Sequence, residues 1–198
     1  RELWRGIEIH RPLHIDVSDS LPDVIAEDVK KWGRGIHLFS KILVYNYLSA
    51  SKLVNELVRI DEFEYDIVLA HDWLSAIAGT AIKRELNLPL VFHVHSTERG
   101  RTLGNGSDVV SNIERRGGQM ADAIVTVSHA MKDELTELGF PQEKIRVCYN
   151  GVDPEKYSME QVSEDEIRAV RQRYGIGDDD LMIYFVGRLT WYFADRLT

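Results

Sequence analysis

The chain has 198 residues, of which 44% are hydrophobic and 28% are charged, and its 24 basic and 32 acidic side chains give a net charge of −8. This composition excludes a disordered chain and predicts a packed globular protein. The acidic balance provides no large positive field, so no nucleic-acid partner is expected. The single cysteine, Cys148, cannot form an internal disulfide, and no apolar run has the length of a membrane span. We therefore expect a cytoplasmic protein without a membrane span.

Short β-branched runs alternate with longer amphipathic stretches along the chain. This alternation is typical of βαβ units, so the sequence predicts an α/β fold with a doubly wound, Rossmann-like parallel sheet. A long apolar-polar segment, Ile36–Ile60, precedes the first strong strand. The expected strands are Asp66–Ala70, Leu90–His95, Ala123–Val127, Lys144–Tyr149 and Leu181–Val186, and the expected helices are Trp73–Leu86, Ser107–Met120, Ser128–Leu138 and Ser163–Tyr174.

An acidic segment separates the last two expected strands. Residues 153–180 contain nine acidic and four basic side chains, which is typical of a linker and a solvated surface. Within it, Ser163 and Glu166 have the spacing of a helix N-cap and its capping box.

Polar groups follow four successive strands, where ligands of open α/β sheets bind. His71 is the leading candidate, because an imidazole can donate a hydrogen bond to a hydroxyl or accept one from it. Asp72 is expected to cap the helix that begins at Trp73, and Trp73 itself belongs either to the core or to the floor of a ligand site. The four groups are His71-Asp72-Trp73, His95-Ser96-Thr97, Ser128-His129 and Asn150-Gly151-Val152-Asp153.

His93 and His95 are two residues apart, so both side chains lie on the same face of a strand. Together with His71 or Asp72 they could hold a metal ion, which would suit a metal-dependent hydrolase. However, His93 lies inside the strand, where a hydrogen-bonded core histidine is the commoner outcome, and no further His, Cys or Glu cluster supports the site. We therefore predict no metal and keep the metal site as an alternative.

The segment Glu98–Ser107 contains three glycines and two arginines and then opens into a helix. Glycine lets backbone amides approach an anion, and an arginine such as Arg99 forms paired hydrogen bonds with phosphate or carboxylate. The segment is either a mobile loop with exposed charge or a loop that closes over substrate. It matches neither phosphate-binding glycine fingerprint, so nicotinamide oxidoreductase chemistry is excluded and no cofactor is expected.

From Asp66 onward, the order and spacing of five motifs resemble the retaining glycosyltransferases of family four and the related glycogen and starch synthases. The motifs extend over most of the remaining chain. They are Ala70-His71-Asp72-Trp73, Phe92-His93-Val94-His95-Ser96-Thr97-Glu98, Ala121-Asp122-Ala123-Ile124-Val125-Thr126-Val127-Ser128, Lys144-Ile145-Arg146-Val147-Cys148-Tyr149-Asn150-Gly151-Val152-Asp153 and Phe185-Val186-Gly187-Arg188-Leu189-Thr190.

The resemblance implies a GT-B fold, in which two α/β domains face each other across a cleft. Residues 1–160 would be the acceptor-side domain, incomplete at its start, residues 161–178 a linker helix, and residues 179–198 the beginning of the donor-side domain. The resemblance also implies site residues. His71 would be catalytic, Asn150 and Gly151 would bind substrate, and Arg188 would bind the donor phosphates. His95 and Ser96, from their place at a strand end, and Arg99, from the segment that follows, are also expected to bind substrate.

The implied reaction transfers a hexose, glucose in the related synthases, from a nucleoside-diphosphate donor of the UDP- or ADP-glucose type to a glycan hydroxyl. After Arg188, the sequence Thr190-Trp191-Tyr192-Phe193 lacks the lysine that family members place there. We therefore expect the 198 residues to be an incomplete member that is inactive alone. A non-catalytic module that binds a carbohydrate or a partner is the alternative. An exposed sheet edge and the apolar tail predict self-association.

Overall fold

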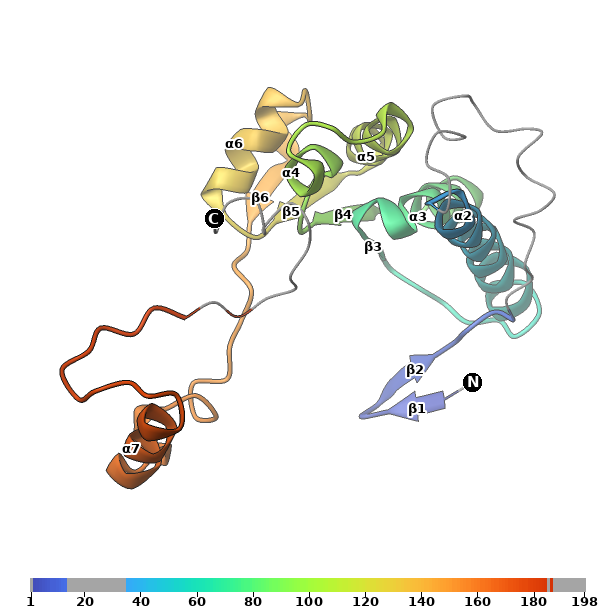
Figure 1. Ribbon diagram of the computed structural model, residues 1–198. Coiled ribbons are helices and arrows are strands. Elements are labelled where there is room, and N and C mark those ends of the chain that lie inside the picture. The colour runs from blue at the N-terminus through green and yellow to red at the C-terminus, as the bar shows by residue number, and fades with distance from the viewer. Residues whose placement is uncertain (1, 14–34, 185, 187–198) are drawn as a thin grey trace. The chain divides into compact units, whose positions relative to one another are not determined.

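The computed structural model (Figure 1) describes residues 2–13, 35–184 and 186 and divides the chain into two compact units, Arg1–Tyr149 and Asn150–Thr198. The first unit contains the sheet and its helices. The second contains one helical turn, Met159–Gln161, and the helix α7, Glu164–Arg173. Among the described residues, no helix has both the length and the apolar character to cross a membrane.

Four parallel strands form the sheet of the first unit, in the order β3-β4-β5-β6. They confirm the predicted α/β class and four of the five predicted strands. The strands are β3 (Val68–His71), β4 (Leu90–Val94), β5 (Ala123–Thr126) and β6 (Ile145–Val147), and the helices between them are α3 (Asp72–Leu86), α5 (Asp108–Met120) and α6 (His129–Glu137).

The two faces of this sheet differ. Because the strands follow one another in spatial order, right-handed crossovers place their helices on the same face, and Figure 1 shows α5 and α6 on one side of the sheet. Alternate residues of β4 (Leu90, Phe92 and Val94) are buried in the core beneath these helices. Val91 and His93 point to the opposite face and are only partly buried.

The segment before the sheet forms α2 (Gly35–Ser51) and a π-helical stretch, Lys52–Val58. Phe39 of α2 stacks on Trp73, with ring centroids 6.2 Å apart, so Trp73 belongs to the core. The buried amide of Asn46 donates to the Leu74 carbonyl (2.7 Å) and accepts from the Ala78 N–H (2.8 Å). This side chain thereby fixes α2 against α3.

The helix ends agree with the sequence signals. Asn87 ends α3 with a left-handed φ of 53°. The Ser128 hydroxyl accepts the Met131 N–H and caps α6. Ser163 and Glu166 form a complete capping box at the start of α7.

Three local features differ from the sequence analysis. The strand expected at Leu181–Val186 is not formed in the described residues 181–184, because a parallel strand needs a neighbour to pair with and none of the described strands pairs there. The segment after β4 begins with a short helix, α4 (Glu98–Thr102), rather than a loop. A hairpin that the sequence analysis did not predict joins β1 (Glu2–Trp4) to β2 (Ile7–Ile9).

Candidate functional site

The site begins where β3 ends. Asp72 follows His71 with a φ of 51°, a left-handed conformation that aspartate tolerates better than most residues. Its Oδ1 accepts the backbone N–H groups of His95 (2.8 Å) and Ser96 (3.4 Å). The expectation that Asp72 caps its own helix is therefore wrong, because the two N–H groups at the end of β4 take its carboxylate. The Ser75 hydroxyl instead bonds the His71 N–H (2.7 Å) and carbonyl (2.8 Å).

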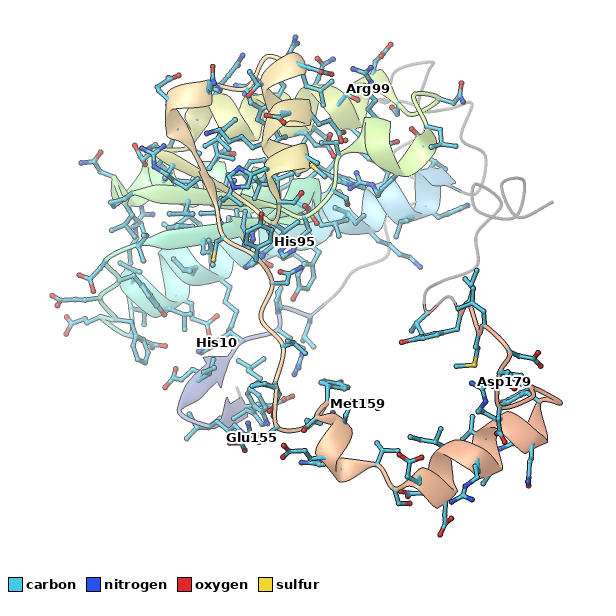
Figure 2. The ribbon with its side chains drawn as sticks, turned by 90° about the vertical axis from the view of Figure 1, so that its left-hand side faces the viewer. His10, His95, Arg99, Glu155, Met159 and Asp179 are labelled. Atoms are coloured by element: carbon cyan, nitrogen blue, oxygen red, sulfur yellow. The ribbon has the colours of Figure 1, made fainter. Side chains whose placement is uncertain are left out.

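Three imidazoles gather on the sheet face opposite the crossover helices. His71 and His93 are register partners on β3 and β4, and His95 lies two residues beyond His93 on the same face. Figure 2 labels His95. His71 Nδ1 lies 3.1 Å from His95 Nε2. The ring of His93 stacks on that of His95, with centroids 4.1 Å apart, and lies 5.0 Å from that of His71. Strand register thus brings together two of the predicted site residues, His71 and His95.

His93 is not the hydrogen-bonded core histidine that its position in the strand predicts. Its Nε2 is buried and has no hydrogen-bond partner among the described residues. Burial lowers the pKa of the His93 imidazole, and positive charge on His95 and His71 would lower it further. The cluster therefore favours a neutral ring at this position.

A charged network holds the segment that follows β4. Arg101 donates to the Ser96 carbonyl (3.0 Å) and hydroxyl (2.9 Å) and forms ion pairs with Glu98 (3.2 Å) and Glu114 (2.8 Å). Both Glu114 oxygens also accept the Glu98 N–H, at 2.8 and 3.0 Å. Arg101 is thus occupied within the protein. Of the two arginines in this segment, Arg99 is the one left for a ligand.

Glu114 is a buried acidic residue of this network that the sequence analysis missed. Only 4% of its surface is exposed, and burial raises the pKa of its carboxyl above the ordinary 4.5, although the Glu98 N–H and Arg101 oppose this shift. The signal is present in the sequence, because Glu114 lies four residues after the buried Val110 and four before the buried Gly118. A carboxylate in the apolar stripe of a helix indicates an internal partner.

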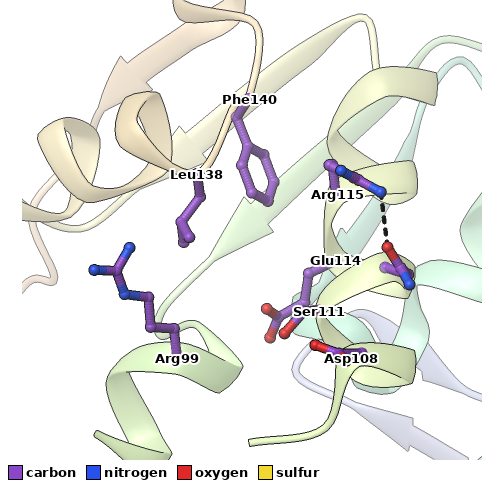
Figure 3. Close-up of a pocket in the computed structure, with 8 residues that line it drawn as sticks. Arg99, Asp108, Ser111, Glu114, Arg115, Leu138 and Phe140 are labelled. Atoms are coloured by element: carbon purple, nitrogen blue, oxygen red, sulfur yellow. Dashed lines mark hydrogen bonds between the residues drawn. The ribbon is translucent and has the colours of Figure 1, made fainter. Parts of the chain in front are cut away.

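Arg99 lines a separate pocket of about 380 Å³ between α4, α5 and the segment after α6 (Figure 3). Leu138 and Phe140 line one side of this pocket, and Ser111 and Glu114 line another. None of the three histidines lines it. The structure thus separates Arg99 from the imidazoles, while Ser96 immediately follows them.

Three other predicted site residues, Asn150, Gly151 and Arg188, belong to the second unit. Asn150 and Gly151 are exposed and form no helix or strand. Arg188 lies outside the described residues.

Comparison with known proteins shows the class to which this fold and its strand-end residues belong, the glycosyltransferases. The family described as Glycosyltransferase Family 4 matches residues 16–156. A glycosyltransferase of Methanocaldococcus jannaschii is 31% identical over 153 residues, which cover 75% of this chain and 39% of that relative. The glycogen synthase of Mycobacterium tuberculosis is 33% identical over 131 residues, which cover 64% and 29% of the two chains.

The solved structure of Anabaena HepE in complex with UDP-glucose matches with a TM-score of 0.50 and 24% identity, over 62% of this chain and 32% of that one. This likeness supports the predicted GT-B fold. The chain belongs to glycosyltransferase family 4 and is similar in sequence to glycogen synthases. It spans less than two fifths of the length of these relatives.

Proposed function

We propose that this chain is the acceptor-side part of a retaining hexosyltransferase that transfers glucose from a nucleoside diphosphate to a glycan hydroxyl. The carrying observation is the 3.1 Å contact between the imidazoles of His71 and His95 at the ends of neighbouring parallel strands. The names of relatives support the substrate class, since they include glycogen synthase and alpha-maltose-1-phosphate synthase, and HepE was solved with UDP-glucose.

His71 is the residue that we assign to the transferred sugar. Its Nδ1 forms a hydrogen bond with His95 Nε2, and this bond fixes the orientation of the ring. The Nε2 of His71 is left for a sugar hydroxyl. His71 is also exposed, whereas His95 is partly buried. In this arrangement His95 positions the catalytic ring.

The remaining assignments divide between the acceptor and the donor. The Ser96 hydroxyl accepts from Arg101 and keeps its own proton for a sugar oxygen. Arg99 would contact a part of the substrate away from the imidazoles, because it lines a different pocket. Asn150 and Gly151 would line the cleft and Arg188 would bind the donor pyrophosphate, as the family resemblance implies.

Retention would come from same-face attack on the donor, with the leaving diphosphate stabilised by cations and aligned donors. Loss of one such group typically slows a reaction by ~10²-fold or more. The sequence after Arg188 offers no lysine beside it, and the chain covers less than two fifths of its relatives. We therefore expect the chain to bind glycan without transferring sugar.

The test titrates the 198-residue chain with a maltooligosaccharide and, separately, with UDP-glucose and ADP-glucose, by calorimetry. We expect binding of the glycan, a clear loss of that binding in His71→Ala, and no loss in His37→Ala. His37 is a matched control, because it is an exposed histidine on α2. Equal glycan affinity of the wild type and His71→Ala would reject the assignment of His71.

A second measurement concerns the donor. With donor and glycan mixed, nucleotide release should stay at the blank level. Release above the blank would show that these residues are sufficient for transfer. Tight binding of either nucleotide sugar to the isolated chain would contradict the assignment to the acceptor side.

A further inference from the structure

We propose that His71, His93 and His95 form a binding site for a divalent transition-metal cation of the zinc class. Each residue offers one ring nitrogen, and the three nitrogens lie within 4.8 Å of one another. The grouping follows from the fold, because β3 and β4 pair in parallel with His71 opposite His93, and the alternation of a strand puts His95 on the same face. The register of the two neighbouring strands therefore holds the three ligands in place.

The donor set selects the kind of cation. Imidazole suits zinc, copper, nickel and iron, whereas magnesium and calcium prefer oxygen ligands. Within the described part of the chain, the group consists of histidines alone. Three protein ligands also leave a fourth tetrahedral position for water or another ligand. The chemistry of the site is thus that of a three-histidine zinc centre with an open position.

The dimensions of the cluster are compatible with such an ion. Zinc–nitrogen bonds of about 2.0–2.1 Å in a tetrahedron place the ligand nitrogens about 3.3–3.4 Å apart. The His71 and His95 nitrogens are already 3.1 Å apart. The longest of the three separations is at most 4.8 Å, so it must contract by no more than about 1.4 Å.

His93 distinguishes a metal from a sugar as the occupant. Its Nε2 is buried and has no hydrogen-bond partner within residues 2–13, 35–184 and 186, which is unusual for a buried polar atom. A sugar hydroxyl at the exposed His71 leaves that nitrogen unpaired, whereas a cation bound through His93 Nε2 satisfies it. The sequence pattern alone favours a hydrogen-bonded core histidine at this position, and the orphaned nitrogen is what favours a cation.

Binding of the cation breaks no bond to carbon and only moves a proton within an imidazole ring. The hydrogen bond between His71 Nδ1 and His95 Nε2 uses one N–H and one lone pair, whereas a cation needs a lone pair from each ring. The shared proton moves to the other nitrogen of its own ring, so a neutral imidazole stays neutral.

The site itself does not rest on the proposed transferase function. One consequence does, namely that a cation on His71 competes with the glycan.

The test uses the 198-residue chain made without a polyhistidine tag and stripped with chelator. Zn²⁺ is titrated by calorimetry, and Co²⁺ is added to a second sample to record the visible bands of a nitrogen-ligated tetrahedral ion. We expect one cation per chain in the wild type and an affinity more than ~10-fold weaker in His93→Gln and in His95→Gln. His37→Gln removes an imidazole outside the group and should bind as the wild type does.

Imidazole nitrogen NMR of the wild-type chain keeps the proposal testable if a variant fails to fold. Substoichiometric Zn²⁺ should shift the ring nitrogens of His71, His93 and His95 together and leave those of His37 and His129 unchanged. Absence of binding in the wild type, shifts confined to other histidines, or undiminished affinity in folded His93→Gln would each overturn the proposal. Metal binding without glycan binding would retain this site and reject the transferase assignment.

Discussion

Asp72 shows how a single residue can organise the end of a parallel strand. Its left-handed φ of 51° turns the chain directly from β3 into α3, and its carboxylate accepts the N–H groups of His95 and Ser96. These two N–H groups lie at the end of β4, beyond the reach of the regular ladder. The spacing between His71 and His95 therefore depends on Asp72, the first residue of α3.

Replacement of Asp72 tests this dependence. Asp72→Ala removes the acceptor and places at this positive φ an alanine, which tolerates it less well than aspartate. We therefore expect the free energy of unfolding to fall by roughly 1–3 kcal/mol in urea denaturation. Asp72→Asn keeps an oxygen acceptor and a residue that tolerates positive φ, so its loss should be clearly smaller. Equal losses of unfolding free energy in the two variants would show that neither the oxygen acceptor nor the tolerance of positive φ matters.

Glu114 predicts a pH dependence of stability. Burial raises its pKa in the folded chain above the ordinary 4.5, so the unfolded chain releases this proton first as the pH rises. The stability contribution is therefore complete below pH 4.5 and is lost as the pH rises through the folded pKa. Glu114→Gln cannot titrate, so urea denaturation from pH 4.5 upward should show the wild type losing stability relative to the variant. A wild type that gains stability relative to Glu114→Gln as the pH rises would contradict this sign.

At the scale of elements, α3 packs closely against the sheet. Gly79 lies on the buried side of α3, where a β-carbon would come within 2.7 Å of the Ala70 Cβ and 3.2 Å of the Leu90 Cδ1. The absence of a side chain therefore lets the helix lie directly on β3 and β4. This packing holds the strand ends that carry His71 and His95.

Gly79→Ala should separate α3 from the sheet and lower the free energy of unfolding by about 1–3 kcal/mol, measured by urea denaturation. Gly151→Ala is the control, because a β-carbon there meets nothing within 4 Å and the backbone has no positive φ. If Gly79→Ala left the free energy of unfolding unchanged, the helix could shift without strain.

At the scale of the whole molecule, the sheet presents an apolar edge. Among the described residues, β3 pairs only with β4, and Leu69 of β3 is 54% exposed. Unpaired strand edges favour association with another chain. The apolar tail expected to add to this tendency lies outside the described residues.

We expect light scattering to show a mass that increases with protein concentration, in chelator so that no metal links two chains. Leu69→Lys should shift the population toward monomer, because a charge on an edge strand opposes pairing. Ile60→Lys, at another exposed apolar position, should not. A monomer at all concentrations in the wild type would contradict the prediction.

Local signals predicted most of the fold. Periodicity located β3 to β6 and the helices between them, because each element has its own repeat of buried residues. The caps at Asn87, Ser128 and Ser163 were readable because they involve neighbouring residues only. The hairpin β1-β2 was missed, although Arg5-Gly6, both with positive φ, has the length of a tight hairpin turn.

The site was predictable only in part. The sequence by itself determined that His71 and His95 stand at strand ends, because the end of a strand is a local property. Only the tertiary structure decided that their rings meet, that the Asp72 carboxylate bonds the end of β4, and that Arg101 is occupied while Arg99 is not. These outcomes depend on strand register and on contacts between residues distant in the chain, and local sequence patterns do not encode either.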